Sequence, residues 1–296
     1  MEPCLKPLHV ALILLVMMIW GFNFVVVKWG LGLMPPFTFV ALRFLVVAIM
    51  LLPFIKPPPR WRELAALSVT LGILHFSLMF TGMRHIDAST AAIAVQLQVP
   101  FAALLAAFFF KDRIGWRRML GMVIAFAGVA LIAGEPRFQG GYLPLILVVA
   151  AACVWSFANI QIKRLGDAID VMALNGWIAV LAFPQLLIVA LLVEGNPLET
   201  VPWDRWGVWG VLAFQSLLVT LVGYGVWYRM MRNFPVNQVM PFTLLIPLFG
   251  VLSGILFLDE PLTWFMLIGG AATLAGVAIC VIRRPGLVEA STKGGL

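Results

Sequence analysis

Two polar side chains each stand four residues before a proline in apolar stretches of the chain. Gln96 precedes Pro100 in QLQVP, and Thr243 precedes Pro247 in TLLIP. A proline removes one backbone hydrogen bond and kinks a helix, and residues four apart share a helical face. An amide and a hydroxyl beside paired kinks can form the wall of a binding pocket, or they can hydrogen-bond neighbouring helices to one another. Both interpretations stay open.

Aromatic and sulfur-containing side chains form two further helical faces. Trp227 and Tyr228 follow Tyr224 by three and four residues, and Met79 follows His75 by four. Such faces suit a flat apolar ligand, because rings stack on one another and a thioether packs against a ring. Tyr228 stands near the end of its apolar stretch, where a tyrosine commonly anchors a membrane helix. Tyr224 and Trp227 are compatible with packing and with ligand binding alike.

A tryptophan and an amide recur together in two stretches that resemble each other. The stretches are WGFNFVVVK at 20–28 and WSFANIQIK at 155–163. Trp20 with Asn23, and Trp155 with Asn159, bring a ring and an amide onto neighbouring faces of a helix. An Asn side chain surrounded by lipid lacks a hydrogen-bond partner, so both amides are expected to face protein or a cavity.

Arg43 is the one cation placed within an apolar stretch. Its guanidinium can bind a carboxylate with two parallel hydrogen bonds. It stands only a turn or two from the end of its stretch, however, where it can reach the membrane surface or backbone carbonyls, so a structural role is favoured. Asn175 and Trp177 are weaker candidates for binding and are compatible with a place at the membrane surface.

Composition places the whole chain in a membrane. Of 296 residues, 62% are hydrophobic and 11% are charged, against about 45–50% and about 25% in soluble domains. The net charge of +7 comes from basic clusters between apolar stretches, which membrane topology explains better than nucleic-acid binding. The three cysteines lack metal-ligand spacing, and His75 has no acidic partner within the spans. We therefore expect no cofactor, no metal site and no enzyme.

Stretches of about 20 apolar residues, the length that crosses a bilayer, divide the chain into ten spans. We place them at 9–28, 37–55, 64–83, 89–110, 115–133, 142–162, 171–193, 207–228, 236–257 and 261–282. The first has no small-residue cleavage site after it and is expected to be retained rather than a signal peptide. Fifteen of the 20 Lys and Arg residues lie on the side of both termini and four on the other. The positive-inside rule therefore puts both termini in the cytoplasm.

An internal repeat extends along the whole chain. The aligned pairs are QVPFAALLAAFFFKDRIGW at 98–116 with IPLFGVLSGILFLDEPLTW at 246–264, and AGVALI at 127–132 with AGVAIC at 275–280. Five spans thus match five spans, and because five is odd, the second set enters the membrane from the opposite side. The predicted fold is an all-α integral membrane protein with ten transmembrane helices in two inverted five-helix repeats, residues 1–138 and 139–296.

Several segments carry a resemblance to a known family. They are WGFNFVVVK, ALRF at 41–44, LDEPLTW at 258–264 and the two AGVA segments. In these segments the chain resembles the ten-helix drug/metabolite transporter (DMT) superfamily, in its EamA-type branch. Within that branch it is most similar to the YddG-type bacterial exporters of aromatic amino acids. The resemblance implies export of amino acids and related small metabolites through a bacterial inner membrane by alternating access. It also implies a central cavity lined by the third, fourth, eighth and ninth spans.

The absence of carboxylates from the predicted spans bears on energy coupling. All thirteen acidic residues fall in predicted loops or tails, whereas proton-driven carriers commonly relay protons through Asp, Glu or His within their spans. We therefore expect uncoupled transport, with proton coupling through His75 as the alternative. Export of another metabolite or a drug is the alternative for the substrate, and a channel or receptor is a less favoured class.

Glycines at intervals of seven residues indicate close helix packing. Gly121 and Gly128, like Gly269 and Gly276, allow two backbones to approach, within the chain or between two chains. We favour packing within the chain and a monomer, with a dimer as the alternative. The expected partners are a small-molecule substrate and membrane lipid, and no nucleic acid.

Overall fold

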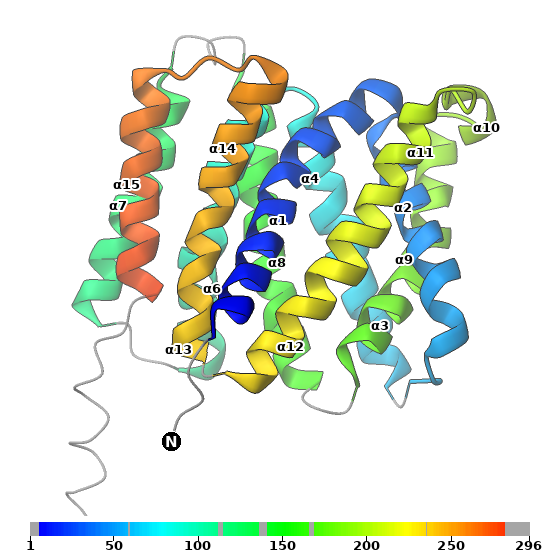
Figure 1. Ribbon diagram of the computed structural model, residues 1–296, viewed down its shortest axis with the longest axis horizontal. Helices are drawn as coiled ribbons and strands as arrows, with labels where there is room; N and C mark the ends of the chain where they lie inside the picture. Colours follow the sequence, from blue (N-terminus) through cyan, green and yellow to red (C-terminus); the bar gives the residue numbers. More distant parts are fainter. Residues whose placement is uncertain are drawn as a thin grey trace, which may run out of the picture.

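Ten membrane-spanning segments make up the fold (Figure 1). The computed structural model describes residues 6–58, 60–111, 115–135, 141–165, 169–234 and 236–281. Within these residues, the helical segments long and apolar enough to cross a membrane are Pro7–Leu33, Pro36–Phe54, Trp61–Met83, Ala88–Phe109, Trp116–Ala133, Leu143–Leu165, Val171–Val193, Trp206–Met231, Met240–Leu258 and Trp264–Val281. The prediction of an all-α protein with ten spans is confirmed.

Five spans are single α-helices and five contain a change of helix type. The single helices are α1 (Pro7–Leu33), α7 (Trp116–Ala133), α8 (Leu143–Leu165), α9 (Val171–Val193) and α15 (Trp264–Val281). The others are α2 (Pro36–Leu51) with η1 (Leu52–Phe54); α3 (Trp61–Leu67), η2 (Ser68–His75) and α4 (Phe76–Met83); α5 (Ala88–Ala94), η3 (Val95–Leu97) and α6 (Gln98–Phe110); α11 (Trp206–Ala213), η6 (Phe214–Tyr224) and α12 (Gly225–Asn233); and α13 (Val236–Val239), η7 (Met240–Leu244) and α14 (Leu245–Leu258). The short helix α10 (Pro197–Thr200) lies in the connection before the eighth span.

The fourth and ninth spans change helix type directly before their prolines. The 3-10 turn η3 leads into α6, whose third residue is Pro100, and the 3-10 turn η7 leads into α14, whose third residue is Pro247. The first turn of an α-helix tolerates proline, because the missing N–H would have no partner within the helix there. Each proline thus begins a new α-helix within its span.

Other local features recur at corresponding places in the two predicted repeats. Lys111 after α6 and Asp259 after α14, which align in the sequence, both adopt the left-handed conformation, with φ of 55° and 53°. The third and eighth spans each contain a π-helical segment, which ends at His75 in η2 and at Tyr224 in η6. Such segments are uncommon and often accompany functional sites.

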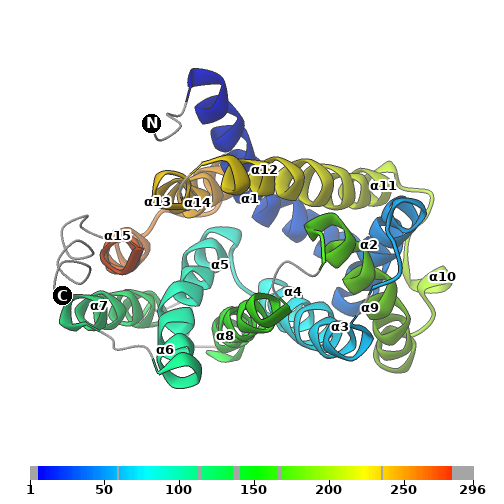
Figure 2. The ribbon, with the colours of Figure 1, turned by 90° about the horizontal axis from the view of Figure 1, so that it is seen from below.

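The glycine stripes lie between α7 and α15. These helices pack side by side at one edge of the molecule (Figure 2), while α2 packs against α9 and α1 against α14. A Cβ atom on Gly121 would lie 2.7 Å from the carbonyl oxygen of Gly276, and one on Gly269 would lie 2.6 Å from that of Gly128. The four glycines therefore serve packing within the chain.

Several span boundaries differ from the sequence prediction by a few residues, among them those near Lys28 and Glu63. The first helix continues past Lys28 to Leu33, because the Lys28 ammonium donates hydrogen bonds to the carbonyl oxygens of Met83 and Ile86, both at 3.0 Å, at the end of α4. The third span begins early enough to include Glu63 in the first turn of α3. Among the acidic residues that the structure describes, this exposed carboxylate is the one that lies within a span, against the prediction that every acidic residue lies in a loop or tail.

Two buried or half-buried carboxylates hold helix N-termini at the end of the molecule opposite the N-terminus of α1. Glu194, after α9, accepts hydrogen bonds from the backbone N–H groups of Phe37 and Thr38 at 2.8 and 2.7 Å. Glu260, after α14, accepts them from the N–H groups of Ala88 and Ser89 at 2.6 and 2.9 Å, and from the Ser89 hydroxyl. A carboxylate at this position satisfies the free N–H groups of the first turn and the positive end of the helix dipole. Each contact ties an early span to a late one.

Candidate functional site

A narrow cavity lies among the second, third, sixth, seventh and eighth spans. It is lined by Arg43, Phe44, Val47, Leu71, Phe76, Trp155, Asn159, Ile162, Leu174, Asn175, Ile178, Thr220 and Tyr224. Its volume of about 50 Å³ leaves room for a few water molecules. A larger ligand therefore enters only when the walls move apart. The fourth and ninth spans, which the family resemblance places around a central cavity, contribute no residue to this lining.

Three of the predicted substrate-binding residues meet at this cavity. Trp155 and Asn159 come from adjacent turns of α8, and Tyr224 comes from the end of η6. The Tyr224 ring packs against Trp20 with the ring centroids 5.4 Å apart, and Trp20 packs against Trp227 at 5.5 Å. Trp20 and Trp227 thus support the Tyr224 ring, which forms one wall of the cavity.

His75 lies next to the cavity as a buried, hydrogen-bonded group. Its Nδ1 atom is 2.9 Å from the carbonyl oxygen of Ala151 in α8, so the ring donates from Nδ1. The ring packs against Trp155 with the centroids 4.9 Å apart and against Phe76 at 4.7 Å. This environment ties the third span to the sixth and orients the Trp155 ring.

Arg43 faces the cavity instead of the membrane surface or the backbone. Its side chain is 4% exposed, and its guanidinium carbon lies 4.6 Å from the centroid of the Phe76 ring and 5.9 Å from that of Phe44. Among the described residues, no hydrogen-bond partner is present for its Nε atom. The sequence favoured a structural role through backbone carbonyls, whereas the structure shows a buried cation beside aromatic rings. The difference arises because α2 continues on both sides of Arg43, leaving neither helix end within reach.

The remaining candidates lie outside the cavity lining. Gln96 is buried in η3, and the Thr243 hydroxyl donates to the Met240 carbonyl oxygen of its own turn at 2.7 Å. Met79 is buried in the apolar core. Asn23 accepts a hydrogen bond from the side chain of Gln215 at 2.5 Å, which links the first span to the eighth. The side chain of Tyr228 lies outside the described residues.

Thr220 and Phe76 are among the lining residues that were missed in the sequence. Thr220 stands four residues before Tyr224, and this spacing on one helical face was the signal available. Phe76 follows His75 directly, at the change of helix type after η2, and its ring reaches the cavity while that of His75 packs against Trp155 of α8. Asn175, named as a weaker candidate, lies on the cavity wall near the start of α9.

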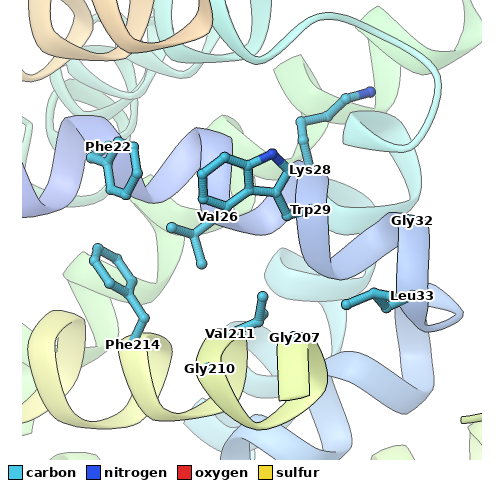
Figure 3. Close-up of a pocket in the computed structure, with 10 residues that line it drawn as sticks. All are labelled: Phe22, Val26, Lys28, Trp29, Gly32, Leu33, Gly207, Gly210, Val211 and Phe214. Carbon is cyan, nitrogen blue, oxygen red and sulfur yellow. The ribbon is translucent and has the colours of Figure 1, made fainter. Parts of the chain in front are cut away.

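A second hollow lies between α1 and α11 and is wider and more open. This groove of about 640 Å³ is lined by Phe22, Val26, Lys28, Trp29, Gly32, Leu33, Gly207, Gly210, Val211 and Phe214. Figure 3 shows the Lys28 side chain extending away from Val26 and Val211, toward the chain beyond the groove. Its ammonium is occupied by the carbonyl oxygens at the end of α4. The groove therefore presents an apolar, aromatic surface without a free charge among the described residues.

Ionisable ligands for a metal do not gather in the part of the chain that the structure describes. No group of three or more His, Cys, Asp and Glu residues there is placed to hold a metal ion. The cavity instead combines a cation, aromatic rings, two amides and a hydroxyl. Such a set can bind a small molecule through hydrogen bonds and ring stacking.

Known proteins similar to this chain are membrane transporters. A probable amino-acid metabolite efflux pump of Escherichia coli (strain K12) is 30% identical over 281 residues, covering 91% of this chain and 93% of its own. A protein of the same description from Salmonella typhimurium is 31% identical over 293 residues, covering 94% and 97%. A solved crystal structure with 15% identity superimposes with a TM-score of 0.63 over 93% of this chain and 96% of its own, which shows a shared fold.

The profile of the EamA-like transporter family matches residues 8–134 and 143–282. Apart from Pro7 at the start of the first span, these two segments contain the ten helical spans that the structure describes. The chain is a multi-pass membrane protein and belongs to the EamA-like transporter family.

Proposed function

We propose that this protein exports amino acids with aromatic side chains, and related small metabolites, from the bacterial cytoplasm. The observation that carries the proposal is the cavity wall, where the rings of Phe76, Trp155 and Tyr224 stand beside the amides of Asn159 and Asn175. Rings stack on a flat side chain, and amides bind an ammonium or a carboxylate group. The efflux-pump description of the two bacterial relatives supports amino-acid metabolites as the substrate class.

The placement of the cavity supports loading from the cytoplasm. Asn175 is the fifth residue of α9, near the membrane side where the N-terminus of α1 lies. At the opposite side, Glu194 and Glu260 tie the N-termini of α2 and α5 to later spans. In our proposal both termini are cytoplasmic, the repeats 1–138 and 139–296 are inverted, and the site opens to each side in turn.

Counterflow in liposomes tests this function. Vesicles that contain the purified protein and unlabelled L-phenylalanine should transiently accumulate labelled L-phenylalanine from outside, because a carrier exchanges substrate through one alternating site. L-Tryptophan and L-tyrosine should compete, whereas L-threonine and L-lysine should not. Competition by threonine or lysine alone would contradict the aromatic specificity and favour export of another metabolite. Equilibration without counterflow would favour a channel.

A matched pair of tryptophan variants tests the cavity itself. Trp155→Ala should reduce the rate of counterflow about tenfold, because one stacking wall is lost. Trp206→Ala should transport normally, since that side chain is 87% exposed at the start of α11. Both variants should reach the membrane in equal amounts. Normal counterflow by Trp155→Ala would remove this cavity from the transport path.

A further inference from the structure

Arg43 is a buried cation, and the described residues that line its cavity include no anion. It stands eight residues into α2, so about 10 Å of helix separates it from the first residue, Pro36. The lining of its cavity, as far as the structure describes it, contains no Asp or Glu side chain. Burial of an unpaired charge in the membrane is costly, and an arginine at such depth is commonly functional.

Aromatic contacts stabilise one side of this cation but do not provide a hydrogen-bond acceptor for its Nε–H group. The Phe76 ring lies 4.6 Å from the guanidinium carbon, which favours the charge by a cation–π interaction. Such a contact does not satisfy the N–H donors, which lie in the plane of the guanidinium group. The Nε atom has no partner among the described residues, and a cavity of about 50 Å³ supplies only a few water molecules.

The shape and charge of the missing partner follow from these donors. A carboxylate is planar, carries the opposite charge and accepts two parallel hydrogen bonds from an arginine. An amide or an amine lacks the negative charge, and an amine lacks the acceptors as well. Tyr224 lies within electrostatic range of Arg43, and its ring borders the space that such a ligand would enter.

We propose that Arg43 binds the carboxylate group of the transported substrate. The proposal rests on the proposed function and deepens it, since it makes the free carboxylate the feature that every substrate shares. With the carboxylate at Arg43, the Asn159 and Asn175 oxygens are available for an ammonium group, and Trp155 for the side chain. In our proposal the substrate supplies the counter-ion that the described lining residues do not provide.

Thermal unfolding of the purified protein in detergent tests the proposal. The added ligands are four compounds of similar size, each with a phenyl ring on a short chain. L-Phenylalanine and 3-phenylpropionate carry a carboxylate, whereas L-phenylalaninamide and phenethylamine do not. The first two should raise the unfolding temperature and the last two should not. Arg43→Gln should weaken binding of both carboxylates about tenfold to a hundredfold, and Arg43→Lys should fall between this variant and the natural protein. Arg205→Gln, at an exposed arginine before α11, should bind them normally.

The unfolding temperature of Arg43→Gln without ligand distinguishes substrate binding by Arg43 from a structural role. If Arg43 only supported the fold, Arg43→Gln would unfold at a lower temperature without ligand. If it binds substrate, the loss of an unpaired buried charge should leave the unfolding temperature unchanged or raise it. Equal stabilisation by acid and amide, unweakened binding to Arg43→Gln, or no stabilisation by any carboxylate would overturn the proposal. Carboxylate binding without flux of aromatic amino acids would refute the proposed function alone and leave the role of Arg43 intact.

Discussion

The contact of Glu260 with the N-terminus of α5 gives a stability prediction of defined size. Its carboxylate accepts hydrogen bonds from the N–H groups of Ala88 and Ser89 at 2.6 and 2.9 Å, and from the Ser89 hydroxyl. A hydrogen bond to a charged group contributes about 1.5–3 kcal/mol, and water at a helix end replaces part of what is lost. With the interaction of the charge with the helix dipole included, we expect Glu260→Ala to lower the free energy of unfolding by about 3 kcal/mol.

Glu260→Gln should cost about half as much as Glu260→Ala, because the amide keeps one acceptor oxygen but turns an NH₂ group toward the other donors. The measurement is unfolding of the purified protein by titration with sodium dodecyl sulfate in mixed micelles. Glu199→Ala is the matched control, since that exposed carboxylate accepts only the Asn196 side chain at 3.3 Å, and it should change the free energy by less than about 0.5 kcal/mol. If Glu260→Ala unfolds like Glu199→Ala, the contact does not hold α5 in place. If Glu260→Gln is as stable as the natural protein, the charge-based reasoning is wrong, and if the Gln and Ala variants are equally unstable, the acceptor oxygen kept by the amide contributes nothing.

Two further predictions concern packing and coupling. Gly128→Ala should lower the free energy of unfolding by about 1–3 kcal/mol, because the added Cβ would lie 2.5 Å from the Gly269 carbonyl oxygen. Gly210→Ala is the control, since no atom lies within 4 Å of its added Cβ. It should leave the free energy unchanged in the sodium dodecyl sulfate titration. In liposomes without a pH difference, substrate should move down its own gradient, and in His75→Ala a proton ionophore should leave that flux unchanged. Uphill accumulation driven by a pH gradient, and lost in His75→Ala, would instead make this histidine the proton site.

The spans could be predicted because lipid allows few alternatives. A backbone that crosses a bilayer must satisfy its hydrogen bonds within the segment, so ten apolar stretches of sufficient length become ten helices. The errors arose where a side chain found a partner elsewhere in the fold. Lys28 looked like the end of a span, yet its ammonium reaches the carbonyl oxygens at the end of α4 and the helix continues.

The candidate site was harder to predict, because it depends on how each helix is rotated about its axis. Gln96 and Thr243 align in sequence and share their spacing to a proline, yet neither lines the cavity found here. Trp155 and Tyr224 do line it, and Tyr224 stands at the end of the π-helical segment η6, while η2 precedes the lining residue Phe76. No residue type marks a π-helical segment in a sequence, so the faces that follow one cannot be assigned from spacing alone.

The residues around the cavity differ in charge between the two predicted repeats, which suits a ligand with two unlike ends. At the 135-residue spacing that relates the two tryptophan motifs, Arg43 of the second span corresponds to Ile178 of the seventh. Both side chains line the same cavity. One repeat therefore contributes a cation where the other contributes an apolar surface. An amino acid has this same polarity, with a charged end and an apolar side chain, so in our proposal the difference between Arg43 and Ile178 sets the orientation in which the substrate binds.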